Sequence, residues 1–432
     1  MTADLLKSLL EGRLTDPDTG ERLVVPTRQV VIAPSLRAEE APLVRALGMG
    51  RRLALVADPT TWSALGARIS GALAAAFTIA PVILPEHPHA DMETVQQVRA
   101  RSSVAEGLIA IGSGTINDLA KYAAHLDRKP YACFATAPSM NGYTSTNAAI
   151  MAEGVKKSLP ATAPRGVFID IAVFCRAPKR MIAAGFGDSL CRPCAQADWL
   201  LSHLLLDTPY RSVPFRLLAE DEAALLGNPE ALANGDVTAM TRLARMLVMS
   251  GFGMALCGGS YPASQGEHLI AHFLEMRGDS AASASFHGEQ IAVTTLTMAR
   301  IQERILARNR LSLSPSTVTE ADLVAYYGPE VGAACWSSFQ PKALDAERAE
   351  ALNARLERRW PEMRDALGAV SRPVADLEAA LGRVGAPVTS AALGVAAGAY
   401  REAVLHAREI RDRFTFLDFA AESGGIPVEA II

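Results

Sequence analysis

Residues Leu108–Tyr122, LIAIGSGTINDLAKY, carry the clearest indication of the fold. The segment begins as an uninterrupted apolar strand, passes through Gly112-Ser113-Gly114 and continues as a helix that contains Asp118 and Lys121. Glycines at such a junction let backbone N–H groups approach a bound phosphate, and the helix N-terminus adds partial positive charge. The third glycine of the Rossmann fingerprint is missing, so a tight structural turn is the alternative interpretation.

Short apolar runs bounded by turn signals lie on both sides of this segment. They alternate with segments of helical periodicity, which is typical of a parallel sheet covered on both faces. The predicted strands are Gln29–Ala33, Arg52–Ala57, Thr78–Leu84, Gly107–Ile111, Tyr131–Ala135 and Val167–Val173. The predicted helices between them are Glu40–Leu47, Thr61–Ala76, Met92–Ala100 and Asn117–Ala124. This pattern favours an α/β domain with a Rossmann-like parallel sheet.

The pattern changes near Arg176. Strand-like runs nearly vanish, and long segments rich in Ala, Leu, Glu and Arg follow, such as Asp236–Leu256 and Asp345–Trp360. At 432 residues the chain is also too long for one compact core. We therefore predict an N-terminal extension over residues 1–27, an α/β dinucleotide-binding domain over residues 28–175, and an all-α metal-binding and catalytic domain over residues 176–432.

Composition excludes several classes of protein. Lys and Arg total 42 against 46 Asp and Glu, a net charge of −4, so no basic field suits nucleic acid. The apolar runs are too short or too interrupted to span a bilayer, and the first residues, MTADLLKSLLEGRL, lack the apolar centre of a signal peptide. Among six cysteines only Cys191 and Cys194 form a CxxC pair, a weak indication of redox or metal use. We expect a soluble, cytoplasmic protein.

Three of the eight histidines, His268, His272 and His287, lie within the segment Ser260–Gln290. His268 and His272 are i and i+4, so they share one face of a helix, whereas His287 opens a second helical run. A single histidine on an apolar face is usually a core residue. Three so close together favour a metal or catalytic cluster, to which a divalent metal would normally add a carboxylate.

Asp188 is a candidate for that carboxylate. It follows two glycines in AAGFGDSL, directly before an apolar helix. An N-cap aspartate suits this position by residue type, and a metal ligand held at a helix end is the alternative. The spacing along the sequence does not place Asp188 beside the histidines.

Two further polar segments follow predicted strands. Asp58 ends RLALVAD, where an acid hydrogen-bonds a ribose hydroxyl in dinucleotide-binding sheets, although a helix cap before Pro59 is equally compatible. The loop Thr136–Ser145, TAPSMNGYTS, lies at the carboxyl end of a strand, where open sheets bind ligands. It can wrap a nucleotide or form a surface turn.

Taken in order, seven motifs resemble those of the sn-glycerol-1-phosphate dehydrogenases, above all the bacterial ones. They are VADPTTW, GSGTINDLAKY, TAPSMNGYTS, AAGFGDSL, GSYPASQGEHLIAH, FHGEQ and IRDRFTFLDFAAESG, and the resemblance extends from about Arg28 to Gly424. The wider superfamily contains iron-containing alcohol dehydrogenases, glycerol dehydrogenases and dehydroquinate synthases. The resemblance implies a dehydroquinate synthase-like fold and hydride transfer between NAD or NADP and dihydroxyacetone phosphate or sn-glycerol 1-phosphate. It also implies a divalent metal (zinc, nickel or iron) and a homodimer.

The resemblance further implies roles for individual residues. Asp188, His268 and His287 would bind the metal, and His272 would contact the substrate. The backbone of the glycine turn would hold the cofactor pyrophosphate, and Asp58 would meet the adenosine ribose. The implied cofactor-binding residues are Asp58, Gly112, Gly114, Thr115, Ile116, Asn117, Asp118, Thr136, Ala137, Ser139 and Ser145.

The pair Asn141-Gly142 departs from the family, in which the loop usually reads Asp-Gly with that Asp beside the substrate. Asn keeps hydrogen bonding but loses the negative charge and the ability to exchange a proton. A metal can still acidify the alcohol as a Lewis acid, so oxidoreduction stays compatible and Asn141 stays a catalytic candidate. For a substrate phosphate, the candidates are Lys156, Lys157 and Arg192.

Three other interpretations stay open. Asn141 favours a different metal-dependent polyol or alcohol dehydrogenase on the same fold. A lyase or cyclase of the dehydroquinate-synthase kind would consume and regenerate NAD within one turnover. A non-catalytic nucleotide-binding relative is disfavoured by Asp188, His268 and His287.

Overall fold

The computed structural model describes residues 2–152 and 155–430, which form two compact units. The first unit runs to Ser189 and also contains Ser212–Ser260 and Arg383–Gly385. The second contains Leu190–Arg211, Tyr261–Gly382 and the chain from Ala386 onward. Packing thus groups several helices beyond residue 175 with the sheet, whereas the predicted division at that residue followed the change of sequence pattern. As a division of function, residues 28–175 and 176–432 stay a prediction.

The first unit is built on a six-stranded parallel sheet in the order β1-β8-β5-β4-β2-β3. Its strands are β1 (Gln29–Ala33), β2 (Arg52–Ala57), β3 (Thr78–Ile83), β4 (Gly107–Gly112), β5 (Tyr131–Ala135) and β8 (Gly166–Asp170). The central strands are buried along their whole length, which explains why they read as continuous apolar runs. The predicted class, an α/β sheet followed by mostly helical sequence, is confirmed.

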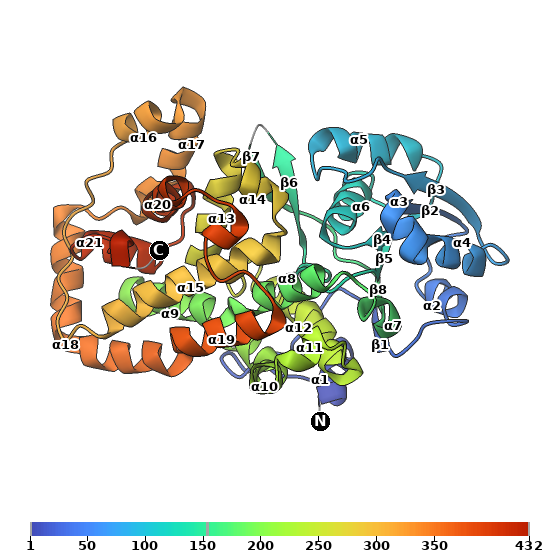
Figure 1. Ribbon diagram of the computed structural model, residues 1–432, viewed down its shortest axis with the longest axis horizontal. Coiled ribbons are helices and arrows are strands. Elements are labelled where there is room, and N and C mark those ends of the chain that lie inside the picture. The colour runs from blue at the N-terminus through green and yellow to red at the C-terminus, as the bar shows by residue number, and fades with distance from the viewer. Residues whose placement is uncertain (1, 153–154, 431–432) are drawn as a thin grey trace. The chain divides into compact units, whose positions relative to one another are not determined.

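Helices cover both faces of this sheet (Figure 1). They are α2 (Glu40–Ala46), α3 (Pro59–Thr61), the π-helical turn η1 (Trp62–Gly66), α4 (Ala67–Leu73), α5 (Met92–Arg101) and α6 (Gly114–Leu126). Leu55 and Ile109 point to the face packed by α2 and α4, because they share one core cluster with Val44 and Ile69. The alternate strand residues face the other side, where α6 packs on β4 and beside α5.

Two features of this region differ from the prediction. The strand expected over Val167–Val173 ends at Asp170, and α7 (Ile171–Phe174) follows it. Asp170 ends the strand because its carboxylate turns back to accept hydrogen bonds from Leu36 N–H (3.1 Å) and the Arg68 guanidinium (2.7 Å). An antiparallel pair, β6 (Asn147–Ala152) and β7 (Val155–Pro160), was not predicted.

Five further helices complete the first unit. They are α1 (Thr2–Leu10), α8 (Lys179–Leu190, which ends beyond Ser189), α10 (Val213–Gly227), α11 (Glu230–Ala233) and α12 (Val237–Leu256). Helix α12 packs along α10 and against α7 and β1, and most of its residues are buried. The segment predicted as an extension, residues 1–27, contributes α1, which packs on α10.

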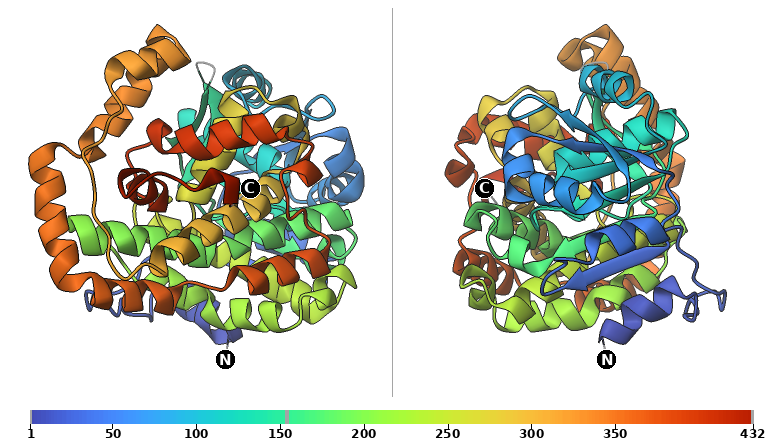
Figure 2. Two further views of the ribbon diagram at one scale, coloured as in Figure 1. Left: turned by 60° about the vertical axis from the view of Figure 1, so that its left-hand side comes forward. Right: turned by 90° about the vertical axis from the view of Figure 1, so that its right-hand side faces the viewer.

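The regular elements in the described residues of the second unit are all helices. Its elements are α9 (Arg192–Leu206), α13 (Gly266–Met276), α14 (Ser280–Ala284), α15 (His287–Leu306), α16 (Glu320–Tyr327), α17 (Pro329–Phe339), η2 (Gln340–Lys342), α18 (Ala346–Val370), α19 (Val374–Val384), η3 (Ala391–Leu393), α20 (Ala397–His406), η4 (Ala407–Ile410), α21 (Phe416–Glu422) and η5 (Val428–Ala430). Figure 2 shows the long α18 (orange) bending midway, and Pro361 lies inside it. Among the described residues, no helix combines the length and apolar character needed to cross a bilayer.

Candidate functional site

The loops that follow β2, β4 and β5 meet at one edge of the sheet. These strands are direct neighbours in the order β5-β4-β2, and all are parallel, so their carboxyl ends lie together. Gly112, the last residue of β4, pairs in register with Ala135, the last residue of β5. The N–H of Thr136 then donates to Gly112 O over 3.1 Å, which ties the two loops together. The topology thus collects the predicted cofactor-binding residues of the first unit at the edge where open α/β sheets bind ligands.

Helix α6 begins inside this edge. Its N-cap, Ser113, is extended and makes no side-chain capping hydrogen bond, and the first N–H groups of any helix lack intrahelical acceptors. A Cβ added to Gly114 would lie 3.1 Å from Met140 Cγ, so glycine leaves the backbone open on the side of the loop after β5. These features fit the pyrophosphate of a dinucleotide, since the helix end supplies N–H donors and partial positive charge.

Asp58 has the capping role that the sequence allowed. Its Oδ1 accepts the Thr61 N–H (2.7 Å), and its own N–H donates to Thr61 Oγ1 (3.0 Å), forming a capping box at the start of α3. It also stands at the carboxyl end of β2, in line with the glycine turn. A contact with the adenosine ribose stays a prediction.

Lys121 holds the loop after β5 and was not predicted as a site residue. The side chain is fully buried, and its Nζ donates to Gly142 O (2.9 Å) and Asn147 O (2.9 Å) and pairs with Asp118 (3.4 Å). Burial lowers the pKa of this ammonium, an effect that Asp118 opposes. The sequence signal was present: Lys121 lies in the helix that leaves the glycine turn, two turns after it.

The same loop is anchored at three more points. The Ser145 hydroxyl contacts Lys121 Nζ (3.1 Å), Tyr143 donates to Ala137 O (2.6 Å), and Thr144 donates to Val248 O (2.6 Å). The predicted loop residues are buried: Thr136, Ala137, Ser139, Asn141 and Ser145. Gly185 of α8 lies so close to Pro138 O that any Cβ would collide with it. The loop is therefore built into the unit and is not a surface turn.

Asp188 is not an N-cap, and that interpretation is wrong. The residue lies inside α8, two residues before its end, because the helix already begins at Lys179. Its side chain is fully buried, and Oδ2 accepts the backbone N–H of Asn141 (2.8 Å). A carboxylate near the C-terminal end of a helix faces the negative pole of the helix dipole. A bound cation would offset both this repulsion and the cost of burying the charge.

The three histidines of the second unit lie together. His268 and His272 stand one turn apart on α13, and His287 is the first residue of α15. Their ring centroids are 5.1 Å apart for His268 and His287, 5.8 Å for His268 and His272, and 6.0 Å for His272 and His287. One ring nitrogen of His268 and one of His287 lie within 4.8 Å of each other. Two imidazoles so placed can share one divalent ion.

Glu267 orients His268. Its Oε1 lies 2.9 Å from Nδ1 of His268, and burial raises the pKa of this fully buried carboxyl group to about 7. An imidazole that donates Nδ1–H to a carboxylate presents Nε2 as a ligand, which is the arrangement found behind metal-binding histidines. The donor chemistry of α13 therefore fits a metal. Glu267 was not predicted, although an acid directly before His268 was a visible signal.

A second set of potential ligands lies beside the first. Cys191, Glu267 and His268 are all buried, and each offers one donor atom within 4.8 Å of the others. Cys191 is the N-cap of α9, and Cys194 follows one turn later with its Sγ 3.5 Å from Thr295 O. All six cysteines are free thiols.

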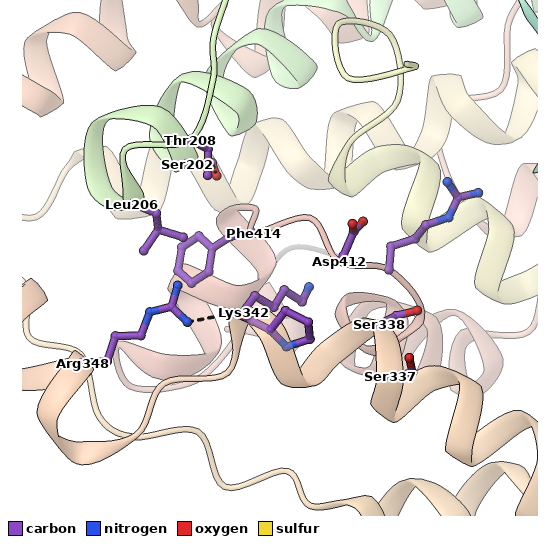
Figure 3. Close-up of a pocket in the computed structure, with 11 residues that line it drawn as sticks. Ser202, Leu206, Thr208, Ser337, Ser338, Lys342, Arg348, Asp412 and Phe414 are labelled. Carbon is purple, nitrogen blue, oxygen red and sulfur yellow. Dashed lines mark hydrogen bonds between the residues drawn. The ribbon is translucent and has the colours of Figure 1, made fainter. Parts of the chain in front are cut away.

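A cavity of about 490 Å³ in the second unit lies elsewhere (Figure 3). It is lined by Ser202, Leu206, Thr208, Ser337, Ser338, Pro341, Lys342, Arg348, Arg411, Asp412 and Phe414. Ser202 is eleven residues beyond Cys191 on α9, about 16 Å along a helix. The Lys342 ammonium pairs with Asp418 (2.9 Å) and donates to the Arg408 carbonyl (2.6 Å). The lining of this cavity contains none of the three clustered histidines, so we do not assign it as the metal site.

Of the three cations considered for a substrate phosphate, two have described side chains, and these two belong to different units. Arg192 begins α9, where Nη1 donates to Gln196 Oε1 (2.9 Å) and burial lowers its pKa to about 10. Lys157 lies on β7 of the other unit, and the side chain of Lys156 is outside the described part of the chain.

Comparison with known proteins shows which family this sequence resembles. The model of the iron-containing alcohol dehydrogenase family matches residues 31–178. Glycerol-1-phosphate dehydrogenase [NAD(P)+] of Geobacillus stearothermophilus is 32% identical over 308 residues, which are 69% of this chain and 76% of that protein. The enzyme of the same name from Bacillus licheniformis is 26% identical over 405 residues, 92% of this chain and 90% of that one. A probable glycerol dehydrogenase from Sinorhizobium meliloti shares the fold, with a TM-score of 0.61, 17% identity and 94% coverage of both chains.

Proposed function

Because the chain belongs to the family of the glycerol-1-phosphate dehydrogenases, we propose that it interconverts dihydroxyacetone phosphate and sn-glycerol 1-phosphate with NAD or NADP. The observation that carries this proposal is the pair His268 and His287, with Glu267 orienting His268 Nδ1 at 2.9 Å. A structural core would not need two ring nitrogens so close together with a buried carboxylate behind one of them. A metal-dependent alcohol dehydrogenase does need them.

The proposed metal ligands are Asp188, His268 and His287. Support for Asp188 comes from its burial near a helix C-terminus, where a negative charge calls for a cation. It also comes from chain connectivity, since Cys191 lies three positions after Asp188 in the sequence, a span of at most about 11 Å. Cys191 has its sulfur within 4.8 Å of a donor atom of His268. Zinc or nickel suits one carboxylate and two imidazoles better than a hard ion such as magnesium, and iron is a third option.

A metal held by Asp188, His268 and His287 would supply Lewis acidity to the substrate oxygen. The chain's own residues orient the substrate. His272, one turn after His268 and 6.0 Å from His287 between ring centroids, is placed to contact it. The backbone N–H of Asn141 donates to Asp188 Oδ2. Because this bond uses the backbone, the side-chain amide of Asn141 would be able to bond the substrate near the same carboxylate.

The proposed cofactor site is the carboxyl edge of the sheet in the first unit. The N-terminus of α6, with Gly112, Gly114, Thr115 and Ile116, would hold the pyrophosphate through backbone N–H groups. The buried loop that begins at Thr136 would line the nicotinamide. When bound, NAD(P)H supplies the hydride. Lys121 anchors this loop by hydrogen bonds to Gly142 O and Asn147 O, so the loop would offer the nicotinamide a fixed surface.

A second candidate substrate class is a polyol or alcohol without phosphate. Asn141 favours it, because the family Asp is absent and no phosphate-binding cation stands out among Lys157 and Arg192. Both candidates use the same metal and cofactor sites. They differ in KM for phosphorylated against unphosphorylated substrates.

We further propose a cytoplasmic homodimer, in line with the family resemblance. Six free thiols suit a reducing compartment. Light scattering after size exclusion tests the dimer, with a mass of twice 45.8 kDa as the expected result and a mass of 45.8 kDa as the contrary one.

The test of the substrate is a panel of steady-state assays. Metal-loaded protein receives NADH or NADPH with dihydroxyacetone phosphate, dihydroxyacetone or glyceraldehyde 3-phosphate, and NAD or NADP with glycerol. The proposal predicts the highest kcat/KM for dihydroxyacetone phosphate, with a product that an enzyme specific for sn-glycerol 3-phosphate does not oxidise. A preference for unphosphorylated ketones supports the second class, and no net change of NAD(P)H absorbance with any of them contradicts both.

A further inference from the structure

The donor set of Cys191, Glu267 and His268 differs in kind from the proposed ligand set. It replaces one imidazole and the Asp188 carboxylate by a thiol and a second buried carboxylate. Thiolate sulfur, imidazole nitrogen and carboxylate oxygen are the three donors of protein zinc sites. The set lies wholly within the second unit and is buried.

Packing holds Cys191 at the level of the histidines. Its side chain shares a small core cluster with Ala271 and Ile291. Ala271 lies three residues after His268 on α13, and Ile291 lies four residues after His287 on α15. Cys191, the N-cap of α9, therefore packs against both helices that carry the imidazoles, α13 and α15. The Cys191 Sγ also lies 3.9 Å from Ala263 O, just ahead of α13.

Glu267 supplies an independent indication of a ligand. The side chain is fully buried. Its Oε1 accepts a hydrogen bond from Gln265 N–H (2.8 Å) and lies 2.9 Å from His268 Nδ1. Among the described residues, Oε2 has no hydrogen-bond partner. A buried carboxylate oxygen without a partner is costly, and coordination of a cation would satisfy it.

We propose that Cys191, Glu267 and His268 form a second metal position that accepts thiophilic divalent cations, such as cadmium or excess zinc. Both positions use His268, so an ion at one position competes with an ion at the other for this imidazole. Binding forms a sulfur–metal bond and releases the thiol proton to solvent. An ion held by Cys191 and His268 weakens the catalytic set, so cadmium inhibits enzyme that already carries its catalytic metal. The site thereby restricts which metals give an active enzyme.

The test uses cadmium as the probe, because a cadmium–thiolate bond absorbs in the ultraviolet and a cadmium–imidazole bond does not. Chelator-treated, metal-free full-length protein is titrated with Cd²⁺ under anaerobic conditions. The wild type is expected to gain thiolate–cadmium absorbance corresponding to a single thiolate at saturation. Cys191→Ser is expected to lose that absorbance entirely. Cys194→Ser, which removes the neighbouring buried thiol of the same CxxC pair, is expected to keep it.

Circular dichroism confirms that both variants are folded before titration. Equal absorbance in Cys191→Ser and the wild type overturns the proposal, and so does stoichiometric cadmium binding to the wild type without thiolate absorbance. Absence of any cadmium binding overturns it as well. These readouts need no substrate, so failure of the proposed dehydrogenase activity leaves them unaffected.

A second readout concerns inhibition. Zinc-loaded enzyme is incubated with increasing Cd²⁺, and the fraction of activity retained is compared between variants. The proposal predicts that Cys191→Ser needs at least about tenfold more Cd²⁺ for half inhibition, equivalent to 1.4 kcal/mol of binding free energy. Identical inhibition curves for Cys191→Ser, Cys194→Ser and the wild type contradict the inhibitory role.

Discussion

The backbone N–H of Asn141 donates to Oδ2 of Asp188 over 2.8 Å, across 47 positions of sequence. Both residues are buried in the first unit. This bond connects the loop that follows β5 with the end of α8, and it orients the proposed metal carboxylate. It also places position 141, where the resemblance led us to expect Asp, next to that carboxylate. Because a backbone group makes the bond, the side chain at position 141 can change without breaking it.

Asn141→Asp restores the acid that the family usually carries. A carboxylate here can accept the proton of the alcohol, and positioned acid–base groups contribute about 10²–10⁴-fold to rates. We expect kcat for alcohol oxidation to rise by about tenfold or more at alkaline pH, with a new loss of activity at low pH as the carboxylate protonates. The pH dependence of kcat measures this. Asn309→Asp, at an exposed position beside Arg364, is the control and should change neither kcat nor the profile. An unchanged profile in Asn141→Asp would exclude proton exchange at this position.

Glu267→Gln tests the orientation of His268. The amide keeps the size of the side chain but removes the charge that holds Nδ1–H. Loss of such a partner typically weakens metal binding about 10–100-fold, and we expect that range here. Competition with a fluorescent chelator measures the dissociation constant for zinc. Glu378→Gln, which removes the surface partner of Arg300, should leave it unchanged. Equal zinc affinity in Glu267→Gln and the wild type would refute the orienting role.

Gly114→Ala tests the approach of the cofactor. The added Cβ would lie 3.1 Å from Met140 Cγ and would intrude where the pyrophosphate meets α6. We expect the dissociation constant for NAD(P)H to rise by at least about tenfold, 1.4 kcal/mol, while the fold is kept. Fluorescence titration with NADH and NADPH measures this. Gly71→Ala is the matched control, since open space surrounds Gly71 in α4 and alanine stabilises a helix by about 0.5–1 kcal/mol. Similar cofactor affinities in the two variants would argue against a site at this edge.

Lys121→Met tests the anchor of the loop after β5. The substitution leaves Asp118 without its cation and removes the donor to Gly142 O and Asn147 O. We expect a loss of at least about 2 kcal/mol in the free energy of unfolding and weaker NAD(P)H binding. Urea denaturation and fluorescence titration measure the two effects. A variant as stable as the wild type would contradict the anchoring role.

The same variant carries a pH signature. Burial lowers the pKa of Lys121 below its ordinary value of 10.5, so between the folded and unfolded pKa the unfolded chain binds more protons. The free energy of unfolding of the wild type should therefore rise with pH in that interval. Lys121→Met should lack this part of the rise. Parallel pH curves of the unfolding free energy for both proteins would exclude a contribution from Lys121.

The fold was predictable because its signals are local. Apolar runs such as that of β4 are fully buried strands, and the glycine turn lies where the sequence placed it. The β6–β7 pair escaped prediction because Asn147–Ala152 and its partner carry no strong alternation and are short. Residues Ile171–Phe174 read as a continuation of β8, because an apolar run does not reveal that Asp170 is held by Leu36 and Arg68. Those partners are more than a hundred residues away.

The proximity of the three histidines was predictable, whereas the surroundings of the other proposed site residues were less so. The three histidines were expected to cluster, and in the structure their rings do. The local pattern at Asp188 favoured an N-cap, because two glycines before an acid resemble a helix start. Those glycines instead lie inside α8, where Gly185 permits contact with Pro138. Lys121 and Glu267 were missed because their importance comes from tertiary hydrogen bonds that spacing does not encode.

We propose that one divalent cation, bound by Asp188, His268 and His287, enables NAD(P)H to reduce dihydroxyacetone phosphate. The most direct measurement is a titration of chelator-treated protein with zinc or nickel during this assay, for the wild type and Asp188→Asn. The account predicts no activity without metal, a rise that saturates at one equivalent for the wild type, and almost none for the variant at the same metal concentration. Full activity in the metal-free protein, or equal activity in Asp188→Asn, would contradict it.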